Sequence, residues 1–406
     1  MRILYVAHRV PFPPNKGDKI RSFQEIKYLS ARHEVHLLAF FDQADDRKHQ
    51  QSLRRFCKSV TLIPLKVARQ RIPAILSMLC RRPWTVGFYR RRVMADAVWR
   101  TFARERIDIV FGYSSSMAQY IDALPAPKLI DLVDSDAAKW RQYSEMISFP
   151  ARQLYAYESR SLAQLETRIV ETFDGSIFVG PREVNEYCDP GVPGGGVRRP
   201  VEMQRIHFMP NGVDLTYFKT RVLEPATPTV IFTGAMDYFP NCDAVIFFCR
   251  TVWPLVIDKV PEARFLIVGS RPVAAIRRLH GHHGVIVTGT VPDVRPYLDS
   301  ASVAVVPLRI SRGIQNKALE ALAAGRPVVM TQQAAAGLKA IADLPVTVAS
   351  EPRAFADGVI AWLCAPEQSE RRAAETREVL NRHYNWETNL SKLDELLAPH
   401  QTPMLV

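Results

Sequence analysis

Short apolar runs alternate with longer amphipathic stretches along nearly the whole chain. The runs are rich in β-branched and aromatic residues, as buried strands are, and the stretches between them have a helical period. We expect strands at 2–7, 35–41, 60–65, 107–112, 128–133, 175–180 and 206–210, and again at 229–234, 264–269, 284–289, 302–308, 326–330 and 345–350. Strands that alternate with helices indicate parallel sheets covered on both faces. The pattern predicts an α/β protein of two doubly wound, Rossmann-like domains facing a central cleft.

A turn signal and a segment rich in proline and threonine separate the two series of strands. An asparagine–glycine pair favours a turn, and 213–228 reads as a linker. We expect an N-terminal domain over 1–212 and a C-terminal domain over 229–385. A final helical segment, 386–406, either packs back on the N-terminal domain or stands apart, which the pattern does not decide.

The composition is that of an ordinary globular protein, with 47% hydrophobic and 23% charged residues in a chain of 406. No tract approaches the ~20 apolar residues of a spanning helix, and the N-terminus does not resemble a signal peptide. The six cysteines form no C-x-x-C pair, which indicates reduced thiols in the cytoplasm. No G-x-G-x-x-G follows the first strand, which argues against a dinucleotide-dependent dehydrogenase.

The net charge of +12 is concentrated in 66–106, which has eleven Lys or Arg residues against two acidic ones. Arginines flank apolar segments there. The region is either a basic amphipathic surface for anionic lipid or a solvated pair of helices. A nucleic-acid patch is a third interpretation. Nothing else in the sequence resembles a recognition module, so we expect no nucleic-acid partner.

Residues 311–329 predict a loop, a helix that begins at Gly313, and a strand. With ~100° per residue, one face of this helix is apolar and a second lane carries Gly313, Lys317, Glu320 and Ala324. A helix start with a glycine favours a phosphate; Lys317 would add charge, and Glu320 would accept from sugar hydroxyls. The alternative is a surface helix on which Lys317 and Glu320 simply form an i,i+3 pair.

The segment VIVTGTVPDVRPYLDSASVAVVPLRISRGIQNKALEALAAGRPVV at 285–329 resembles the retaining glycosyltransferases of family 4, which have the two-domain GT-B fold. Supporting segments are HFMPNGVDLTYF at 207–218 and VIFTGAMDYFPNCDAV at 230–245. The likeness extends over nearly the full length. Within the family, the GIQNK helix is most similar to exopolysaccharide- and exosortase-associated sugar transferases.

The resemblance implies a nucleotide-diphosphate sugar as donor. Glu320 matches the second glutamate of the family's E-x₇-E motif, which contacts the ribose or sugar. Gly313 and Ile314 would offer backbone N–H groups to the donor. Val291 lies where the main chain holds the base, and Gly17 matches a loop that closes over the donor phosphates. Gly234, at a strand end, would also line the donor site.

Two departures from the family pattern change the expected charges. The first glutamate of E-x₇-E is replaced by Arg312, and the Arg and Lys that clamp the diphosphate are missing from 235–241. A diphosphate still needs positive charge. We expect Lys317 to supply it, with Arg309 and Arg312 as further candidates.

Polar residues at strand ends of the first domain are candidates for the acceptor side. The family's histidine is replaced by Asp134, which would act as a general base or form a turn or helix cap. Asp18 is either a helix N-cap or an acceptor contact. His8 either touches substrate or makes a structural hydrogen bond. Tyr113 and Ser114 either line an acceptor pocket or start a helix.

We therefore predict a glycosyltransferase in which Lys317, Glu320 and Asp134 are catalytic. Its partners would be a nucleotide sugar, a glycan or lipid-linked acceptor and, through 66–106, an anionic membrane surface. We expect no metal and no other cofactor, and a cytoplasmic place, peripheral on the inner face of the membrane. Two alternatives stay open: a nucleotide-sugar epimerase of the same fold, and a non-catalytic nucleotide-sugar or glycan-binding protein.

Overall fold

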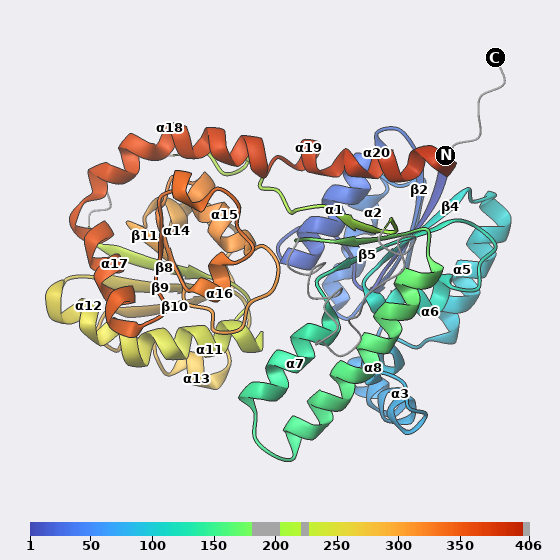
Figure 1. Cartoon of the computed structure of the whole chain (residues 1–406), viewed down its shortest axis with the longest axis horizontal. Helices are drawn as coiled ribbons and strands as arrows, with labels where there is room; N and C mark the ends of the chain where they lie inside the picture. The colour runs from blue at the N-terminus through green and yellow to red at the C-terminus, as the bar shows by residue number, and fades with distance from the viewer. Residues whose placement is uncertain (181–203, 221–226, 401–406) are drawn as a thin grey trace. The chain divides into compact units, whose positions relative to one another are not determined.

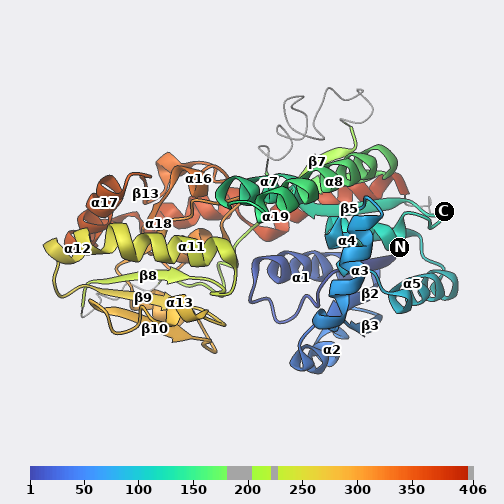
Figure 2. The same ribbon diagram turned by 90° about the horizontal axis from the view of Figure 1, so that it is seen from below.

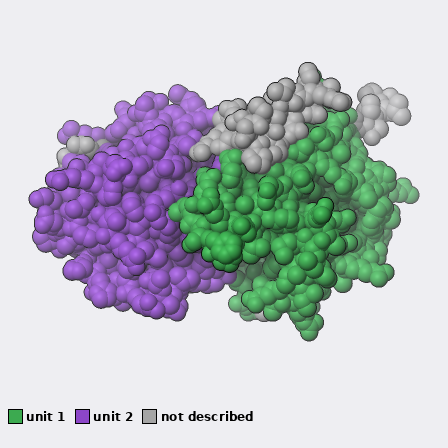
Figure 3. All heavy atoms as spheres, turned by 60° about the horizontal axis from the view of Figure 1, so that its bottom comes forward, with its two compact units in different colours: residues 1–210, 390–406 green, residues 211–389 purple. Residues whose placement is uncertain are grey.

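The computed structural model describes residues 1–180, 204–220 and 227–400. The chain divides into two compact units, coloured separately in Figure 3. Unit 1 comprises residues 1–210 and 390–406, and unit 2 comprises residues 211–389. The segment expected to be a linker, 213–228, lies in unit 2, and its residues 221–226 are outside the described part of the chain.

Unit 1 is built on a seven-stranded parallel sheet with the order β3-β2-β1-β4-β5-β6-β7. Figure 1 shows part of this sheet, with β2, β4 and β5 labelled. The strand order reverses between β1 and β4, which is the switch point of a doubly wound sheet. The strands are β1 (Arg2–Ala7), β2 (Glu34–Phe41), β3 (Ser59–Pro64), β4 (Ile109–Tyr113), β5 (Lys128–Val133), β6 (Gly175–Phe178) and β7 (Ile206–Phe208).

Unit 2 is built on a six-stranded parallel sheet with the order β10-β9-β8-β11-β12-β13. Its order reverses between β8 and β11. The strands are β8 (Thr229–Thr233), β9 (Arg264–Val268), β10 (Val285–Gly289), β11 (Val303–Val306), β12 (Val328–Met330) and β13 (Val346–Val348).

Helices connect the strands of each sheet. In unit 1 they are α1 (Gly17–Ser30), α2 (Gln50–Leu53), α3 (Val67–Leu79), α4 (Trp84–Phe88), α5 (Arg92–Glu105), α6 (Ala118–Ile121), α7 (Asp136–Met146), α8 (Ala151–Thr172) and α20 (Lys392–Leu397). In unit 2 they are α11 (Phe239–Phe247), α12 (Trp253–Lys259), α13 (Ala274–Arg277), α14 (Arg295–Asp299), α15 (Asn316–Ala323), α16 (Gln332–Ala335), α17 (Pro352–Cys364) and α18 (Pro366–His383), with α19 (Trp386–Leu390) at its end.

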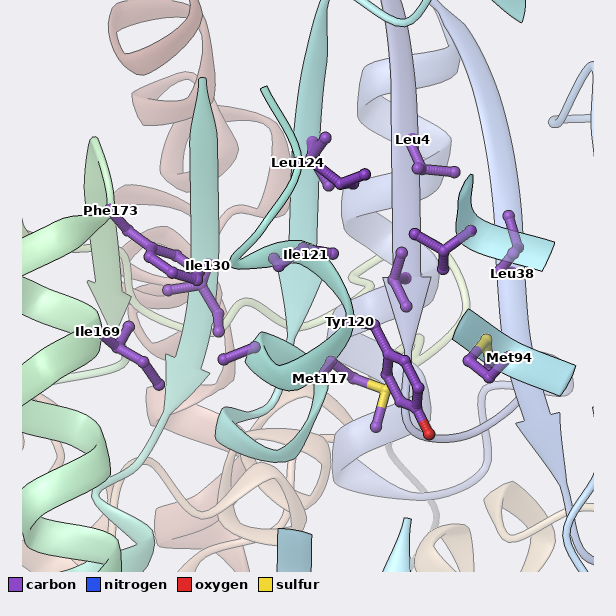
Figure 4. Packing of buried hydrophobic residues seen from close by; sticks show 14 of the residues in the cluster. Leu4, Leu38, Met94, Met117, Tyr120, Ile121, Leu124, Ile130, Ile169 and Phe173 are labelled. Atoms are coloured by element: carbon purple, nitrogen blue, oxygen red, sulfur yellow. The ribbon is translucent and has the colours of Figure 1, made fainter. Parts of the chain in front are cut away.

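The unit 1 core forms where the apolar faces of α5, α6 and α8 cover one side of the sheet. Figure 4 shows residues of this cluster, with Leu4 and Leu38 from strands, Met94 from α5, and Phe173 just after α8. The strand β1 is central and apolar on both faces, and its residues from Ile3 to Ala7 are fully buried. Burying such side chains is the main stabilising contribution to the fold.

The prediction of two Rossmann-like α/β domains is confirmed: each predicted strand overlaps an observed one, and all strand pairs are parallel. The C-terminal segment from residue 390 belongs to unit 1, where Tyr28 donates to the Asp394 carboxylate at 2.7 Å. Within the described residues, no helix has the length and apolar character needed to cross a bilayer.

Candidate functional site

Two loops of unit 2 meet at the switch point of its sheet. Gly234 directly follows β8, and residues 307–315 join the neighbouring strand β11 to α15. In open parallel sheets, ligands bind outside the carboxyl ends of the strands at such a point. The donor residues predicted around Gly234 and Gly313 therefore come together at the place where this architecture holds a ligand.

The helix that carries Lys317 and Glu320 begins later than expected. The predicted start at Gly313 is wrong, because α15 begins at Asn316 with Gln315 as an extended N-cap. Gly313 has φ 58°, a left-handed conformation that belongs to a loop rather than a helix. Ala324 is the C-cap, so of the predicted lane only Lys317 and Glu320 lie on the helix.

Lys317 points toward the end of β8. Its Nζ donates to Asn241 Oδ1 at 2.6 Å and lies 4.2 Å from the centroid of the Phe232 ring. The Asn241 amide in turn donates to the Ala235 carbonyl at 2.9 Å. The alternative of a simple Lys317–Glu320 surface pair is not observed, because no ion pair joins these two described residues and the lysine is bound to an amide and a ring.

The electrostatics of this lane are unusual for charged side chains. Desolvation lowers the pKa of Lys317 to about 7, although the nearby Glu320 carboxylate opposes the shift. Desolvation also raises the pKa of Glu320 to about 7, with Lys317 opposing it. A cation without a hydrogen-bonded counter-charge can interact strongly with a bound anion.

Two backbone crossings fix the loops beside Lys317. A Cβ atom on Gly269 would lie 1.6 Å from the Gly234 carbonyl oxygen, and one on Gly337 would lie 2.2 Å from the Gly313 carbonyl oxygen. A side chain on Gly234 would lie 3.2 Å from Lys317 Nζ. Because Gly269 and Gly337 have no side chains, the backbone at Gly234 and Gly313 can approach them closely. Gly234 likewise leaves room for the Lys317 ammonium group.

The other predicted donor residues have varied surroundings. Arg309 binds Asp243 through a two-point ion pair and lies 5.1 Å from the Phe247 ring centroid. The Arg312 carbonyl accepts from the Gln315 side chain at 2.9 Å. Ile314 is buried, and Val291 follows the edge strand β10. The structure thus ties Arg309 to a carboxylate, while the hydrogen bond that Lys317 donates among the described residues goes to a neutral amide.

Sequence reasoning did not find the residues that anchor α15 from a distance. Asn211, in the PNG segment, donates to Asn316 Oδ1 at 2.9 Å at the start of the helix. In the sequence, Asn241 stands out only as one of the positions where a clamp residue is missing. The only signal in the sequence is the asparagine itself. Its hydrogen-bond partner is not evident from the sequence, because Asn316 lies 105 residues after Asn211 and Lys317 lies 76 residues after Asn241.

Predicted residues of unit 1 also gather at the switch point of their sheet. His8 follows β1 and stacks on Tyr113 at the end of β4, with ring centroids 5.7 Å apart. Asp18 is the second residue of α1, after Gly17. Its Oδ2 accepts from Arg9 at 2.5 Å and lies 3.5 Å from His8 Nε2.

Asp18 is not a helix N-cap. The N-cap of α1 is Lys16, which makes no side-chain capping bond. Burial alone would raise the pKa of Asp18, but its hydrogen bond with His8 and the charge of Arg9 lower that pKa below its usual value. The carboxylate therefore stays ionised and orients two side chains beside the sheet edge.

The segment after β5 contains two further acidic residues, Asp134 and Asp136. Asp134 is half-buried, and the cap of the following helix α7 is Ser135, whose Oγ accepts from the Ala138 N–H at 3.1 Å. The alternative role of Asp134 as a helix cap is therefore wrong. Ser114 Oγ lies 3.2 Å from Ser116 Oγ, and Ser115 donates to Asp136 at 2.7 Å.

A buried charge network under this edge was missed by sequence reasoning. Arg21 Nε donates to Asp131 Oδ2 at 2.5 Å, and Arg21 Nη1 donates to the Met209 carbonyl at 2.9 Å. Tyr5 donates to Glu25 at 2.5 Å. These four side chains are fully buried. An arginine on a helix and an aspartate in a strand give no sign in the sequence that they will pair.

Among the described residues, no group of three or more histidine, cysteine or acidic side chains could hold a metal ion. The polar groups at the unit 2 site are Lys317, Glu320, Asn241 and backbone groups. Such a site can bind an anion at Lys317 and a hydroxyl-bearing ligand at Glu320.

Comparisons with known proteins identify relatives of this part of the chain. Residues 227–365, which include Gly234, Lys317 and Glu320, match the family model described as glycosyl transferases group 1. An uncharacterized 44.6 kDa protein in the cps region of Klebsiella pneumoniae is 21% identical over 371 residues, which is 88% of this chain and 90% of that protein.

Solved structures share the fold over nearly the full length. Sucrose-phosphate synthase from Thermosynechococcus elongatus superposes with a TM-score of 0.70 at 16% identity, over 98% of this chain and 99% of that one. HepE from Anabaena, solved with UDP, has a TM-score of 0.67 at 13% identity, over 98% and 100% of the two chains. These likenesses show the GT-B fold. With the family match over 227–365, they support a glycosyltransferase of that fold.

Proposed function

We propose that this protein transfers a sugar from a nucleotide-diphosphate donor to a glycan or lipid-linked acceptor, with retention, in polysaccharide or glycoconjugate assembly at the cytoplasmic face of the membrane. The observation that carries the proposal is Lys317. Its ammonium group lies at the carboxyl end of β8, beside Gly234, and its hydrogen bond goes to the neutral amide of Asn241.

A bound nucleotide diphosphate would supply the hydrogen-bonded negative counter-charge that the ammonium group of Lys317 lacks. The leaving group of the transfer is a phosphate, and a fixed cation stabilises the negative charge that develops on it. Backbone N–H groups near Gly313 would hold the same diphosphate. Glu320, one turn along α15 from Lys317, would accept from the hydroxyls of the ribose or sugar.

The acceptor is assigned to unit 1. His8, Tyr113 and Asp18 lie together at its switch point, where ligands of doubly wound sheets bind. Asp134 is proposed as the group that takes the proton from the acceptor hydroxyl. Positive charge at the donor comes from Lys317, and we assign no metal and no further cofactor to the reaction.

Relatives suggest which donor and which process to test first. HepE of Anabaena was also solved with UDP-glucose, which suggests a uridine nucleotide sugar as the first donor to test. The relative in a cps region suggests a role in exopolysaccharide synthesis. The following experiments identify the base, the sugar and the acceptor.

Donor binding is tested by thermal shift and calorimetry with UDP, GDP, ADP and their sugar derivatives. A ligand that binds the folded state raises its melting temperature. Lys317→Met should weaken the best ligand roughly 10- to 100-fold, because it removes a charge-assisted hydrogen bond. Lys259→Met, an exposed lysine of α12, is the matched control and should bind normally. Unchanged binding by Lys317→Met would overturn the proposed donor site.

Reaction type is tested by following a labelled donor with and without candidate acceptors. Transfer to an acceptor with the anomeric configuration preserved, as read by NMR, is the expected result. An isomerised donor in the absence of acceptor would indicate an epimerase instead. Tight binding without any turnover on a panel of lipid-linked and soluble acceptors would favour a non-catalytic binding protein.

A further inference from the structure

The helix α3 presents an apolar face to the outside of unit 1. Ile72, Ile75, Leu76 and Leu79 are 67%, 55%, 55% and 71% exposed. We call these four residues the α3 stripe. With ~100° per residue they fall within an arc of about 100°, so they form one continuous outward face. Figure 2 shows α3 on the outside of unit 1.

The opposite face of α3, which packs on the protein, is polar. Gln70 and Ser77 are its buried residues. Ser77 donates to the Pro83 carbonyl at 2.8 Å, and a Cβ atom on Gly87 would lie only 2.4 Å from Ser77 Cβ, so α3 and α4 are tightly joined there. Tyr157 of α8 donates to the Met78 carbonyl at 3.1 Å. The apolar side chains are therefore held outward by a fixed helix orientation.

The sequence of α3 and its flanks is basic. Residues 66–82 contain five Lys or Arg and no Asp or Glu. In helical projection, Arg71 and Arg69 fall just outside the two margins of the apolar arc. The five cations are exposed, and none makes an ion pair within the described part of the chain. They are Lys66, Arg69, Arg71, Arg81 and Arg82.

We propose that α3 lies in the headgroup layer of an anionic membrane, with the α3 stripe inserted and the flanking cations on lipid phosphates. This deepens the proposed function, since it places the enzyme at the surface where a lipid-linked acceptor resides. Of the predicted basic surface over 66–106, the proposal uses the α3 part, although Val93 and Trp99 of α5 are also exposed. In α5, Met94 and Val98 are buried in the unit 1 core.

Charge and length favour lipid over the other occupants. A helix of 13 residues is ~20 Å long, too short to span the ~30 Å hydrocarbon core but suited to lying in the interface plane. A second copy of this chain would bring the same five cations against these, which is repulsive at a symmetric contact. A protein partner would need an acidic rim, whereas anionic lipid supplies negative charge along the whole helix.

The proposal is tested with the full chain by flotation on vesicles of phosphatidylcholine alone or mixed with phosphatidylglycerol. Binding is expected only to the anionic vesicles and should weaken at high salt. Ile75→Asn with Leu79→Asn should lower the partition coefficient at least about tenfold, because two inserted side chains are lost. The control Leu255→Asn with Val273→Asn removes exposed apolar residues of unit 2 and should bind normally.

A second pair of variants tests the charges. Arg69→Gln with Arg71→Gln should weaken binding roughly fivefold for each charge removed. Arg250→Gln with Arg278→Gln is the matched control on unit 2. All variants should keep normal melting temperatures and nucleotide binding, which separates failure of this proposal from failure of the donor site.

Three results would overturn the membrane assignment. The first is no binding to anionic vesicles at low salt. The second is equal binding to neutral and anionic vesicles. The third is self-association in sedimentation, without vesicles, that the Ile75→Asn, Leu79→Asn variant abolishes, since that would assign the stripe to a second copy of the chain.

Discussion

The close backbone approach of Gly269 to Gly234 allows a test of whether the position of the loop after β8 controls nucleotide binding. In Gly269→Ala the new methyl group would lie 1.6 Å from the Gly234 carbonyl oxygen, whereas ordinary contact begins at 3.4 Å. The Gly234 segment is fixed on both sides of the crossing. Gly234 N–H donates to the Val268 carbonyl at 3.0 Å, and Met236 N–H donates to the Ser270 carbonyl at 2.8 Å. Relief requires this segment to move away from Gly269.

The expected cost is that of overpacking, about 1–3 kcal/mol of unfolding free energy. For a unit of this size that corresponds to a fall of roughly 2–12 °C in melting temperature. Because Gly234 lies beside Lys317 and Asn241, its displacement should also raise the Kd for the bound nucleotide at least about tenfold. Melting is measured by differential scanning fluorimetry and Kd by calorimetry.

The control is Gly281→Ala, far from the site in sequence. Gly281 has φ +84°, and a Cβ atom there would meet nothing within 4 Å. Its cost is therefore only the backbone strain, about 1–2 kcal/mol, with no change in Kd. A Gly269→Ala variant with normal Kd, or a Gly281→Ala variant that loses binding equally, would refute the reasoning.

Three further predictions concern charge. The Kd for a nucleotide diphosphate should rise above pH 7, by at most about tenfold per pH unit, because Lys317 must take up a proton to bind it; a Kd independent of pH would contradict this. In Lys317→Met, the melting temperature relative to the native protein should fall as pH rises from 7 to 10, since the folded-state pKa lies below the ordinary 10.5 and the penalty of the buried cation disappears over that range. In Asp18→Asn, acceptor KM should rise while nucleotide Kd is unchanged; a changed Kd would argue against the separate assignment of the two sites.

The sequence predicted the strands well because each is a short apolar run between polar helical stretches. The start of α15 was misplaced for a local reason. The alanine and leucine pattern extends back to Ile314, but Gly313 adopts a left-handed conformation and Gln315 an extended one, so the helix begins at Asn316. Apolar periodicity indicates which face is buried and leaves the first turn undetermined.

Contacts between distant residues were beyond sequence reasoning. Lys317 and Asn241 are 76 residues apart, and Arg21 and Asp131 are 110 apart. Only the packing of the sheet brings such pairs together. The region 66–106 shows the same limit, because a basic and apolar composition is shared by α3, which exposes its apolar side chains, and α5, which buries Met94 and Val98.

Under the proposed function, the surroundings of Lys317 would explain how one cation serves a site whose other clamp residues are missing. Burying a lysine beside an amide and an aromatic ring, without a hydrogen-bonded carboxylate, disfavours its charged form, which is why its pKa falls to about 7. Arg309, by contrast, already has a carboxylate partner in Asp243, which offsets its positive charge. A diphosphate that reaches Lys317 supplies the missing counter-charge in a partly desolvated place, where a charge-assisted hydrogen bond is strong. Under the proposed function, binding of the donor diphosphate would offset the energetic cost of holding this lysine away from water, and Lys317 alone would serve where the family pattern has two cations.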